Sequence, residues 1–372
     1  MADQTVLGPG ATIGILGGGQ LGRMLALAAA RLGLKCHIYS PKGDNPAFEV
    51  AHMATPAGYG DTAALTAFAA SVDVATYEFE NVPLPAASLV EGHVPLYPPP
   101  AALEVSQHRV NEKTFFNDAG IATAGWLHAQ TADELVELTA GRLGSHGAGG
   151  IMKTCRLGYD GKGQARVSSS DEVRRAWDEL GGQDLIFEWL VPFAREVSVI
   201  AARAATGAVE VFDIAENIHE NGILRTSQVP ARISPSARRR AHEIATLALE
   251  KLDYIGVIAI ELFVVETDAG EQLLVNEFAP RVHNSGHWSE AACAVSQFEQ
   301  HIRAIAGWPL GDPRRHSDAE MHNLLGEEVN DWQGLAGQSD AVVHIYGKAA
   351  CRPGRKMGHV THLSPLRELS ER

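Results

Sequence analysis

The alternation of strand and helix at the start of the chain constrains its fold most. Short apolar segments have the composition of buried strands, and Ala- and Leu-rich segments between them have the composition of helices. Consecutive strands that are joined through helices run parallel, so the pattern predicts an α/β unit with a parallel sheet. The predicted strands are residues 12–16, 35–39 and 72–76, and the predicted helices are residues 20–32 and 65–70.

The rest of the chain predicts further units of α+β composition. At 372 residues the chain exceeds the length that one hydrophobic core usually supports, so we expect two or three domains around a shared cleft. A Pro-rich segment at 94–100 closes the first unit, a small block of helices and strands follows, and from residue 195 strands alternate with a long helix at 236–252. The predicted domains are residues 1–108, 109–188 and 189–372.

Charge and cysteine content exclude several classes of protein. With 31 basic and 45 acidic residues the net charge is −14, which argues against sequence-independent binding to nucleic acid or to an anionic membrane. There is no apolar run of about 18 residues and no signal-peptide pattern, so we expect a cytoplasmic protein without a membrane span. The cysteines lack C-x-x-C spacing and are expected to be reduced, at core or neutral positions. They are Cys36, Cys155, Cys293 and Cys351.

Two acidic residues face each other across a predicted hairpin. Apolar runs at 257–265 and 272–278 flank the turn T-D-A-G at 267–270. If the hairpin is centred on the alanine of that turn, Glu261 lies directly opposite Glu277, where like charges destabilise each other. Both acids alternate with apolar neighbours, so they should be partly buried and need a cation, for which Mg²⁺ is the natural choice. The alternative is an accidental pair on a solvated sheet face.

A dense polar segment overlaps the end of this hairpin. Residues 276–288 read N-E-F-A-P-R-V-H-N-S-G-H-W and include a carboxylate, a guanidinium, two imidazoles and two carboxamides. Polar groups that are buried without partners are costly, so a core would not concentrate them in this way. The segment therefore indicates a functional site.

A glycine-rich turn after the first strand has more than one interpretation. Gly17, Gly19 and Gly22 have the spacing of the dinucleotide fingerprint, which would indicate an NAD-linked dehydrogenase. The acid that such enzymes place after the second strand is missing, since the chain reads Y-S-P-K at 39–42 and has no carboxylate before Asp44. The helix N-terminus could instead bind another phosphate or a carboxylate, or the glycines could only let strand and helix pack closely.

A second glycine-rich loop is a stronger nucleotide signal. Lys153 ends a predicted strand, and the residues that follow it, through Gln164, include glycines at 158, 161 and 163. Such a backbone can close over phosphates while the ammonium group neutralises them. The spacing differs from that of the P-loop, so a P-loop fold is not expected. The alternative is a surface hairpin, but phosphates over Lys153 and a cation on the paired acids would be complementary halves of one Mg-nucleotide site.

Together these segments resemble the ATP-grasp ligases, and more narrowly the 5-(carboxyamino)imidazole ribonucleotide synthetases of purine biosynthesis. The resemblance extends over nearly the whole chain. It implies a Rossmann-like N-terminal (pre-ATP-grasp) domain, a small lid domain and a larger C-terminal ATP-grasp domain. The segments that carry it are I-G-I-L-G-G-G-Q-L-G-R-M (13–24), T-Y-E-F-E-N-V (76–82), K-T-C-R-L-G-Y-D-G-K-G-Q (153–164) and the polar segment 276–288.

The resemblance also implies roles for individual residues. Those that match ATP-binding positions are Arg109, Lys153, Gly158, Tyr159, Asp160, Gly161, Lys162, Gly163, Gln164, Glu188, Trp189, Leu190, Val191, Glu196, His219, Asn276 and Glu277. Those that match positions around the ribonucleotide substrate are Gln20, Leu21, Glu78, Tyr159, Arg281, His283, Asn284, Lys348 and Arg355, the last two at its phosphate. The implied Mg²⁺ ligands are Glu261 and Glu277, and the implied catalytic residues are Asp160, Arg281 and His283.

The implied reaction is the ATP-dependent carboxylation of 5-aminoimidazole ribonucleotide. Bicarbonate attacks the γ-phosphate to give carboxyphosphate and ADP, and the CO₂ released from carboxyphosphate is captured by the 5-amino group. Carboxyphosphate is easily hydrolysed, so the loop after Lys153 is expected to close as a lid, and a homodimer is expected from the resemblance. The alternatives are a formate-dependent glycinamide ribonucleotide transformylase, an NAD-linked dehydrogenase and a nucleotide-binding regulator without turnover.

Overall fold

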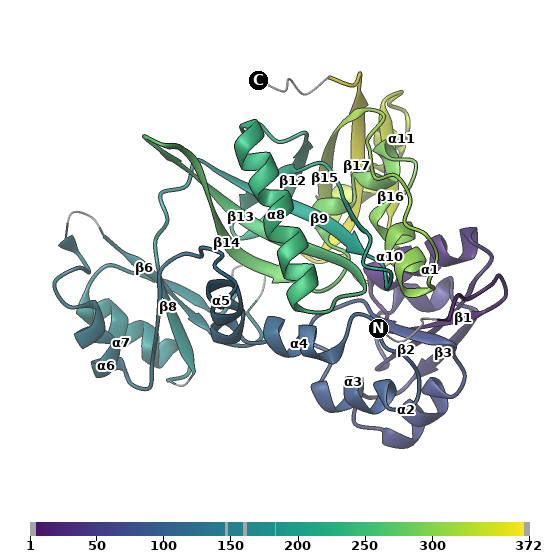
Figure 1. Ribbon diagram of the computed structural model, residues 1–372, viewed down its shortest axis with the longest axis horizontal. Helices are drawn as coiled ribbons and strands as arrows, with labels where there is room; N and C mark the ends of the chain where they lie inside the picture. Colours follow the sequence, from purple (N-terminus) through teal and green to yellow (C-terminus); the bar gives the residue numbers. More distant parts are fainter. Residues whose placement is uncertain (1–4, 146–147, 159–161, 183, 368–372) are drawn as a thin grey trace.

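The computed structural model describes residues 5–145, 148–158, 162–182 and 184–367, and the strands of these residues form three sheets (Figure 1). A parallel sheet belongs to the N-terminal part, a small antiparallel sheet lies at the left of Figure 1, and a large antiparallel sheet runs through the middle. This combination of α/β and α+β units confirms the predicted fold class.

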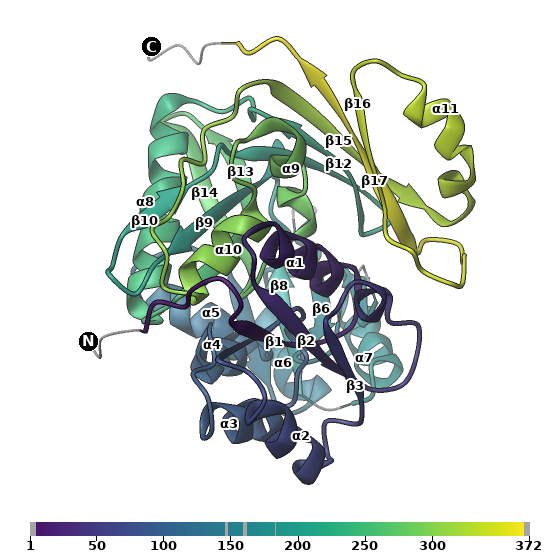
Figure 2. The same cartoon turned by 90° about the vertical axis from the view of Figure 1, so that its right-hand side faces the viewer.

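The N-terminal sheet is parallel, as predicted, and has the order β3-β2-β1-β4. Helix α1 lies on one side of this sheet and helices α2 and α3 lie on the other (Figure 2). Apolar residues of β1 alternate between the two faces: Ile13 and Ile15 pack with α1, whereas Leu16 packs with α2 and α3. Strand β3 was not predicted, because its four residues are mostly exposed and end in a proline. The elements are β1 (Thr12–Leu16), α1 (Gln20–Arg31), β2 (Lys35–Ser40), η1 (Pro46–Glu49), β3 (Met53–Pro56), α2 (Thr62–Ala69), β4 (Val74–Tyr77), α3 (Leu84–Glu91) and α4 (Pro100–Ser106).

The small sheet has the order β5-β8-β6-β7 and is covered by helices α6 and α7. Both helices begin with a side-chain cap, in which Thr131 and Ser169 accept hydrogen bonds from backbone N–H groups of the first turn. Helix α5 leads into this unit from the N-terminal part. The elements are α5 (Arg109–Asp118), β5 (Trp126–Ala129), α6 (Ala132–Thr139), β6 (Gly150–Thr154), β7 (Gln164–Val167), α7 (Ser170–Glu179) and β8 (Leu185–Trp189).

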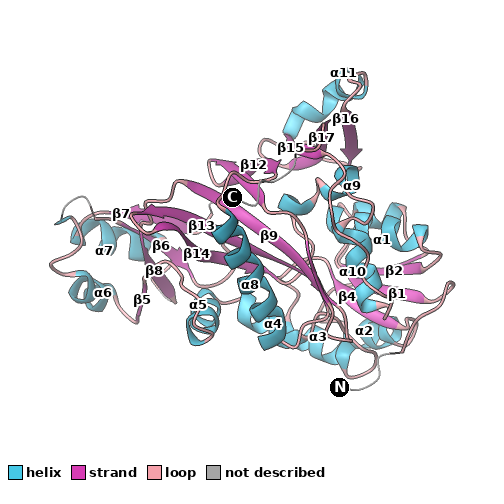
Figure 3. Ribbon diagram, turned by 45° about the horizontal axis from the view of Figure 1, so that its top comes forward, coloured by secondary structure: helices cyan, strands magenta, loops and turns pink. Residues whose placement is uncertain are grey.

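The large sheet runs from the hairpin β13–β14 to the strands β16 and β17 (Figure 3). Its order is β14-β13-β9-β11-β12-β15-β17-β16, and β10 pairs with β9. The strands are β9 (Arg195–Arg203), β10 (Val209–Val211), β11 (Ala215–Glu220), β12 (Ile223–Val229), β13 (Gly256–Thr267), β14 (Gly270–Ala279), β15 (Asp318–Leu325), β16 (Ala341–Ile345) and β17 (Lys356–Ser364).

Helices cover both faces of the large sheet at strands β9 and β13. Val199 and Ala201 pack with helix α8, whereas the intervening Ile200 and Ala202 pack with helix α10. Helix α10 also packs against α1, so one hydrophobic core joins the N-terminal part to the large sheet (Figure 2). The remaining helices are α8 (Pro235–Lys251), η3 (Asn284–Gly286), α9 (Ser289–Ala292), α10 (Gln297–Ile305), η4 (Gly326–Asp331) and α11 (Trp332–Ala336).

The hairpin β13–β14 places Glu261 opposite Glu277, as predicted, but for a different reason. The turn is not centred on Ala269, because Thr267 pairs directly with Gly270 and only two residues connect the strands. The register then shifts by one residue between Glu261 and Leu262, which makes Asn276 the extra residue of a β-bulge. The bulge therefore produces the pairing of the two acids.

Three further predictions concern the whole chain. Among the described residues, no helix combines the length and the apolar character needed to cross a membrane. Cys36, Cys155 and Cys293 are buried and Cys351 is exposed, and all four are free thiols, as predicted. The domain boundaries after residues 108 and 188 stay predictions.

Candidate functional site

A polar cleft of about 370 Å³ lies where the three sheets approach one another. The N-terminal sheet contributes the segment after β4, the small sheet contributes the loop after β6, and the large sheet contributes the hairpin and the segment after β14. The predicted site residues that line it are Gln20, Leu21, Glu78, Arg109, Gly158, His219, Glu261, Glu277, Arg281, His283 and Asn284. Residues far apart in the sequence thus form one site.

The pKa values of the paired acids of the hairpin are shifted in opposite directions. Burial, and the nearby charge of Glu277, raise the pKa of Glu261 to about 7. Burial also acts to raise the pKa of Glu277, but Arg109, whose Nη1 lies 3.0 Å from the carboxylate, and Lys153 outweigh it, so that this pKa is lowered. A divalent cation between the acids would offset their repulsion and favour the ionised form of Glu261.

The groups beside the pair fit a hard cation. The side-chain oxygen of Asn276 is buried and has no hydrogen-bond partner among the described residues. Two carboxylates with a neighbouring amide oxygen are the ligand types that Mg²⁺ prefers. His283 Nε2 lies 3.4 Å from Glu261 Oε1.

Two cationic side chains, those of Lys153 and Arg109, pair with the carboxylates of Glu188 and Glu277. Lys153 Nζ lies 3.1 Å from Glu188 Oε2, and Arg109 donates hydrogen bonds to Glu277 and to the carbonyl oxygen of Gly158. Burial lowers the pKa of Lys153, although Glu188 opposes this effect. Arg109 therefore links helix α5, the loop after β6 and strand β14, which belong to different parts of the fold.

Several charged residues of the site were not predicted. Lys113 is fully buried, and its Nζ donates to the carbonyl oxygen of Asn276 (2.6 Å) and lies 3.5 Å from Glu188. Glu112 accepts a hydrogen bond from the N–H of Phe278 (2.7 Å), and burial raises its pKa to about 8. The sequence offered one signal for Glu112 and Lys113, which is that both charged residues lie on the buried face of helix α5. Glu80 and Lys356 also line the cleft, and Glu80 accepts a hydrogen bond from Arg281 Nε.

The glycine-rich turn after β1 holds a carboxylate of the protein itself. Glu78 accepts hydrogen bonds from the N–H groups of Gly19 (2.9 Å) and Gly22 (3.2 Å), and burial raises its pKa. A Cβ atom at Gly19 would lie 2.8 Å from Glu78 Oε1, so the glycine permits this approach. Because the carboxylate takes the place at the helix N-terminus that a pyrophosphate would need, the NAD alternative loses its support.

The predicted phosphate residues lie on a neighbouring part of the surface. Lys348 Nζ donates to the carbonyl oxygen of Lys356 (2.6 Å), and burial together with nearby Arg355 lowers the pKa of Lys348 to about 8. Arg355 Nη1 lies 2.7 Å from Asp44 Oδ2. Asp44 lines a second hollow, of about 350 Å³, which shares Glu78 and Phe79 with the cleft. The two hollows therefore meet at Glu78.

The remaining predicted residues differ in how they relate to the cleft. Glu196 and His219 pair with each other at 3.0 Å, and both side-chain polar atoms of Asn284 are buried without a hydrogen-bond partner among the described residues. Predicted residues that do not line the cleft are Lys153, Lys162, Gly163, Gln164, Glu188, Trp189, Leu190, Val191, Glu196, Asn276, Lys348 and Arg355. Tyr159, Asp160 and Gly161 lie outside the described residues.

Three family models match the chain in succession. They are the ribonucleotide synthetase preATP-grasp domain at residues 10–107, the ATP-grasp domain at 114–298 and the phosphoribosylaminoimidazole carboxylase C-terminal domain at 319–371. Fold and site therefore define an ATP-grasp enzyme with a preATP-grasp domain at its N-terminal end.

Individual relatives are similar over almost the full length. The N5-carboxyaminoimidazole ribonucleotide synthase of Brucella melitensis is 52% identical over 98% of this chain and 99% of the relative. The crystal structure of an ADP complex of an N5-carboxyaminoimidazole ribonucleotide synthetase matches with a TM-score of 0.91 and 39% identity, over 98% of this chain and 94% of the other. This chain belongs to the N5-carboxyaminoimidazole ribonucleotide synthase family.

A further structure shows which ligands a relative binds. The N5-carboxyaminoimidazole synthase of Aspergillus clavatus was crystallised with ADP and 5-aminoimidazole ribonucleotide. It matches with a TM-score of 0.87 and 29% identity, over 96% of this chain and 94% of the other.

Proposed function

We propose that this protein is an ATP-dependent ligase that carboxylates 5-aminoimidazole ribonucleotide with bicarbonate. The products are 5-(carboxyamino)imidazole ribonucleotide, ADP and phosphate, within purine biosynthesis. The observation that carries the proposal is the junction of two kinds of subsite in one cleft. We assign Glu261 and Glu277, with their cationic neighbours, to the nucleotide side of the cleft, and Arg281, His283 and Glu78 to the acceptor side.

On the nucleotide side the protein supplies positive charge and position. Arg109 and Lys153 are proposed to neutralise the phosphates of ATP, which requires Lys153 to exchange part of its contact with Glu188 for phosphate oxygens. Glu261 and Glu277 would hold Mg²⁺, which supplies charge neutralisation at the phosphates. The remaining proposed ATP-binding residues are Gly158 to Gln164, Glu188 to Val191, Glu196, His219 and Asn276.

On the acceptor side the protein orients the ribonucleotide next to the reactive carbonate. Arg281 donates hydrogen bonds to Glu80 and to the carbonyl oxygen of Val282 (3.0 Å), and these bonds hold its side chain in one conformation. Its remaining donors can therefore contact an anion with little further loss of conformational freedom. His283 is oriented by Ser285, whose Oγ lies 2.9 Å from its Nδ1. The remaining proposed contacts are Gln20, Leu21, Glu78, Tyr159, Asn284, Lys348 and Arg355.

The chemical step divides into phosphorylation and carboxylation. A bicarbonate oxygen attacks the γ-phosphate, the bond to ADP breaks, and carboxyphosphate forms. Carboxyphosphate then breaks down to CO₂ and phosphate, and the 5-amino group attacks CO₂ and loses a proton. His283 or Asp160 is proposed to receive that proton. The positively charged groups around the cleft stabilise the charge that develops in both steps.

A coupled ADP-release assay tests this proposal. We expect ADP release that requires bicarbonate and rises at least tenfold when 5-aminoimidazole ribonucleotide is added. Formate with glycinamide ribonucleotide serves as the matched alternative substrate pair, and it should give no release above background. Release with the formate pair but not with bicarbonate would contradict the proposal and favour the transformylase.

The assembly and location of the protein are also proposals. We propose a homodimer in the cytoplasm, as the family resemblance implies. Sedimentation at twice the 39.8 kDa mass of the chain would support the dimer, and sedimentation as a single chain at micromolar concentration would contradict it.

A further inference from the structure

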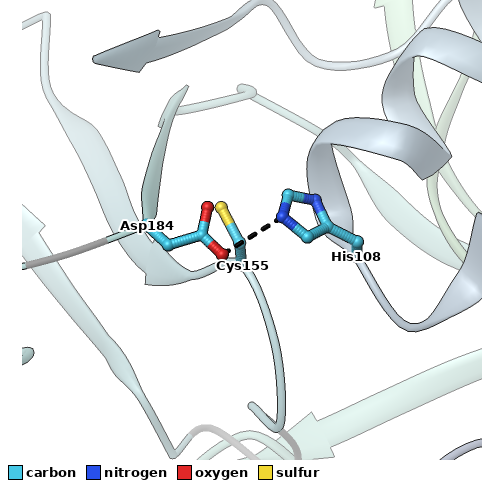
Figure 4. A group of neighbouring side chains, drawn as sticks. All are labelled: His108, Cys155 and Asp184. Carbon is cyan, nitrogen blue, oxygen red and sulfur yellow. Dashed lines mark hydrogen bonds and ion pairs between the residues drawn. The ribbon is translucent and has the colours of Figure 1, made fainter. Parts of the chain in front are cut away.

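A second group of ligand-bearing side chains lies beside the nucleotide loop. His108 precedes helix α5, Cys155 follows strand β6 and Asp184 precedes strand β8, and their side chains converge (Figure 4). One imidazole nitrogen, the thiol sulfur and one carboxylate oxygen all lie within 4.8 Å of one another. His108 Nε2 is 3.1 Å from Asp184 Oδ2. The group lies outside the acid pair of the hairpin.

A second imidazole approaches the same carboxylate. His128, in strand β5, has its Nε2 3.5 Å from Asp184 Oδ1. That nitrogen and Nδ1 of His108 are both buried and have no hydrogen-bond partner within the described part of the chain. Asp184 itself has a φ of +50°, in the left-handed region that non-glycine residues rarely adopt. The hydrogen bond between His108 Nε2 and Asp184 joins two of these groups, whereas Nε2 of His128 lies beside them without a hydrogen-bond partner within the described residues.

We propose that His108, Cys155 and Asp184, with His128 as a fourth donor, form a binding site for Zn²⁺. Thiolate and imidazole ligands favour zinc over Mg²⁺, which prefers oxygen ligands, so this site and the acid pair would select different cations. Ligand atoms around a tetrahedral zinc ion lie roughly 3–4 Å apart, so only small side-chain movements would close the site.

Zinc binding displaces the proton of the thiol. A thiol has an ordinary pKa of about 8.5, so most of it carries a proton at pH 7. When the cation binds, the bond from sulfur to hydrogen is replaced by one from sulfur to zinc, and one proton leaves to the buffer.

The site lies at the junction that positions the nucleotide-binding cations. The N–H of Arg109 donates to the carbonyl oxygen of Cys155 (3.0 Å), and the N–H of Cys155 donates to the carbonyl oxygen of Asp184 (3.0 Å). Zinc would therefore fix the start of helix α5 to the ends of two strands of the small sheet. The zinc site does not depend on the proposed reaction.

Titration of the full-length, EDTA-treated protein with Co²⁺ tests the site. Cobalt bound to thiolate absorbs in the near ultraviolet, whereas cobalt on the carboxylates of the hairpin does not give this band. We expect the band in the unaltered protein and its loss when one equivalent of Zn²⁺ is added. Cys155→Ser should abolish the band and weaken binding by more than about tenfold. Cys351→Ser, which changes the exposed thiol, is the matched control and should keep the band.

Two further variants keep the test decisive if Cys155→Ser does not fold. Asp184→Asn and His108→Gln should each weaken Co²⁺ binding by about tenfold or more. Calorimetric titration in two buffers of different ionisation enthalpy should detect the release of about one proton. Absence of the band in the unaltered protein, its persistence in Cys155→Ser, or unchanged affinity in the other two variants would overturn the proposal.

Discussion

At the scale of single residues, the acid pair shows how burial and charge divide the roles of like side chains. Glu277 has Arg109 at 3.0 Å and keeps a low pKa, whereas Glu261 has no cation at that distance among the interactions described and its pKa rises to about 7. Two identical side chains across one hairpin thus have pKa values that are shifted in opposite directions. A cation that binds both acids would favour the ionised form of Glu261.

Replacement of one acid by its amide tests the metal assignment. Glu277→Gln keeps the shape of the side chain but removes the charge that would face Mg²⁺, so we expect kcat/KM for ATP to fall by roughly 100-fold or more. Glu266→Gln on the adjacent strand changes a more exposed carboxylate and should leave kcat/KM unchanged. Circular dichroism verifies that both variants fold. Near-normal turnover of Glu277→Gln would remove Glu277 from the metal site.

At the scale of elements, the turn between β1 and α1 shows how one sequence pattern can have two structural meanings. The three fingerprint glycines were compatible with a cofactor, with another anion or with close packing. The structure shows that they surround Glu78, whose carboxylate accepts two backbone hydrogen bonds there. Local spacing determines that the turn can hold an anion, but only the position of the segment after β4 determines which anion it holds.

The close contact at this turn predicts the effect of a single methyl group. In Gly19→Ala the new Cβ would lie 2.8 Å from Glu78 Oε1, so the carboxylate must move and lose a backbone hydrogen bond. We expect a loss of about 1–3 kcal/mol in stability, which is measurable as a lower Tm. Gly43→Ala is the control, because a Cβ there meets no atom within 4 Å. An unchanged Tm for Gly19→Ala would contradict the proposed role of this glycine.

At the scale of the whole molecule, a buried histidine joins the N-terminal sheet to the large sheet. His301 in helix α10 lies 2.9 Å from Thr76 Oγ1, in β4, and accepts a hydrogen bond from the N–H of Val257, in β13 (3.1 Å). Burial lowers its pKa from 6.5 to about 3, so the imidazole is neutral in the folded protein. Protonation would leave a charged donor facing an N–H group.

The pH dependence of stability follows from this shift. Between pH 6.5 and 3 the unfolded chain binds a proton at His301 that the folded protein does not, so stability is lost as the pH falls through this window. At pH 5 the loss is about 2 kcal/mol. In His301→Gln the Tm should fall less between pH 7 and pH 5 than in the unaltered protein. His93→Gln, at an exposed position, is the control, and equal pH dependence in all three proteins would refute the argument.

The sequence by itself determined the features that depend on local patterns. The alternation of strand and helix predicted the parallel sheet, and the apolar runs around the turn at 267–270 predicted the hairpin, although the pairing of Glu261 with Glu277 depends on a bulge that the sequence did not predict. The polar segment after the hairpin predicted a site, and its Arg281 and His283 do line the cleft. Such features depend on a few neighbouring residues, so they can be predicted from the sequence before the tertiary structure is known.

Only the tertiary structure decided which distant residues meet. Lys113 reaches the backbone of Asn276 across 163 positions, and the contact of Thr76 with His301 spans 225 positions. The convergence of Cys155 with His108 and Asp184 also had no local signal, because each residue lies at the end of a different element. These contacts depend on how the sheets and helices pack against one another. The sequence around one residue does not indicate which distant residue will become its partner.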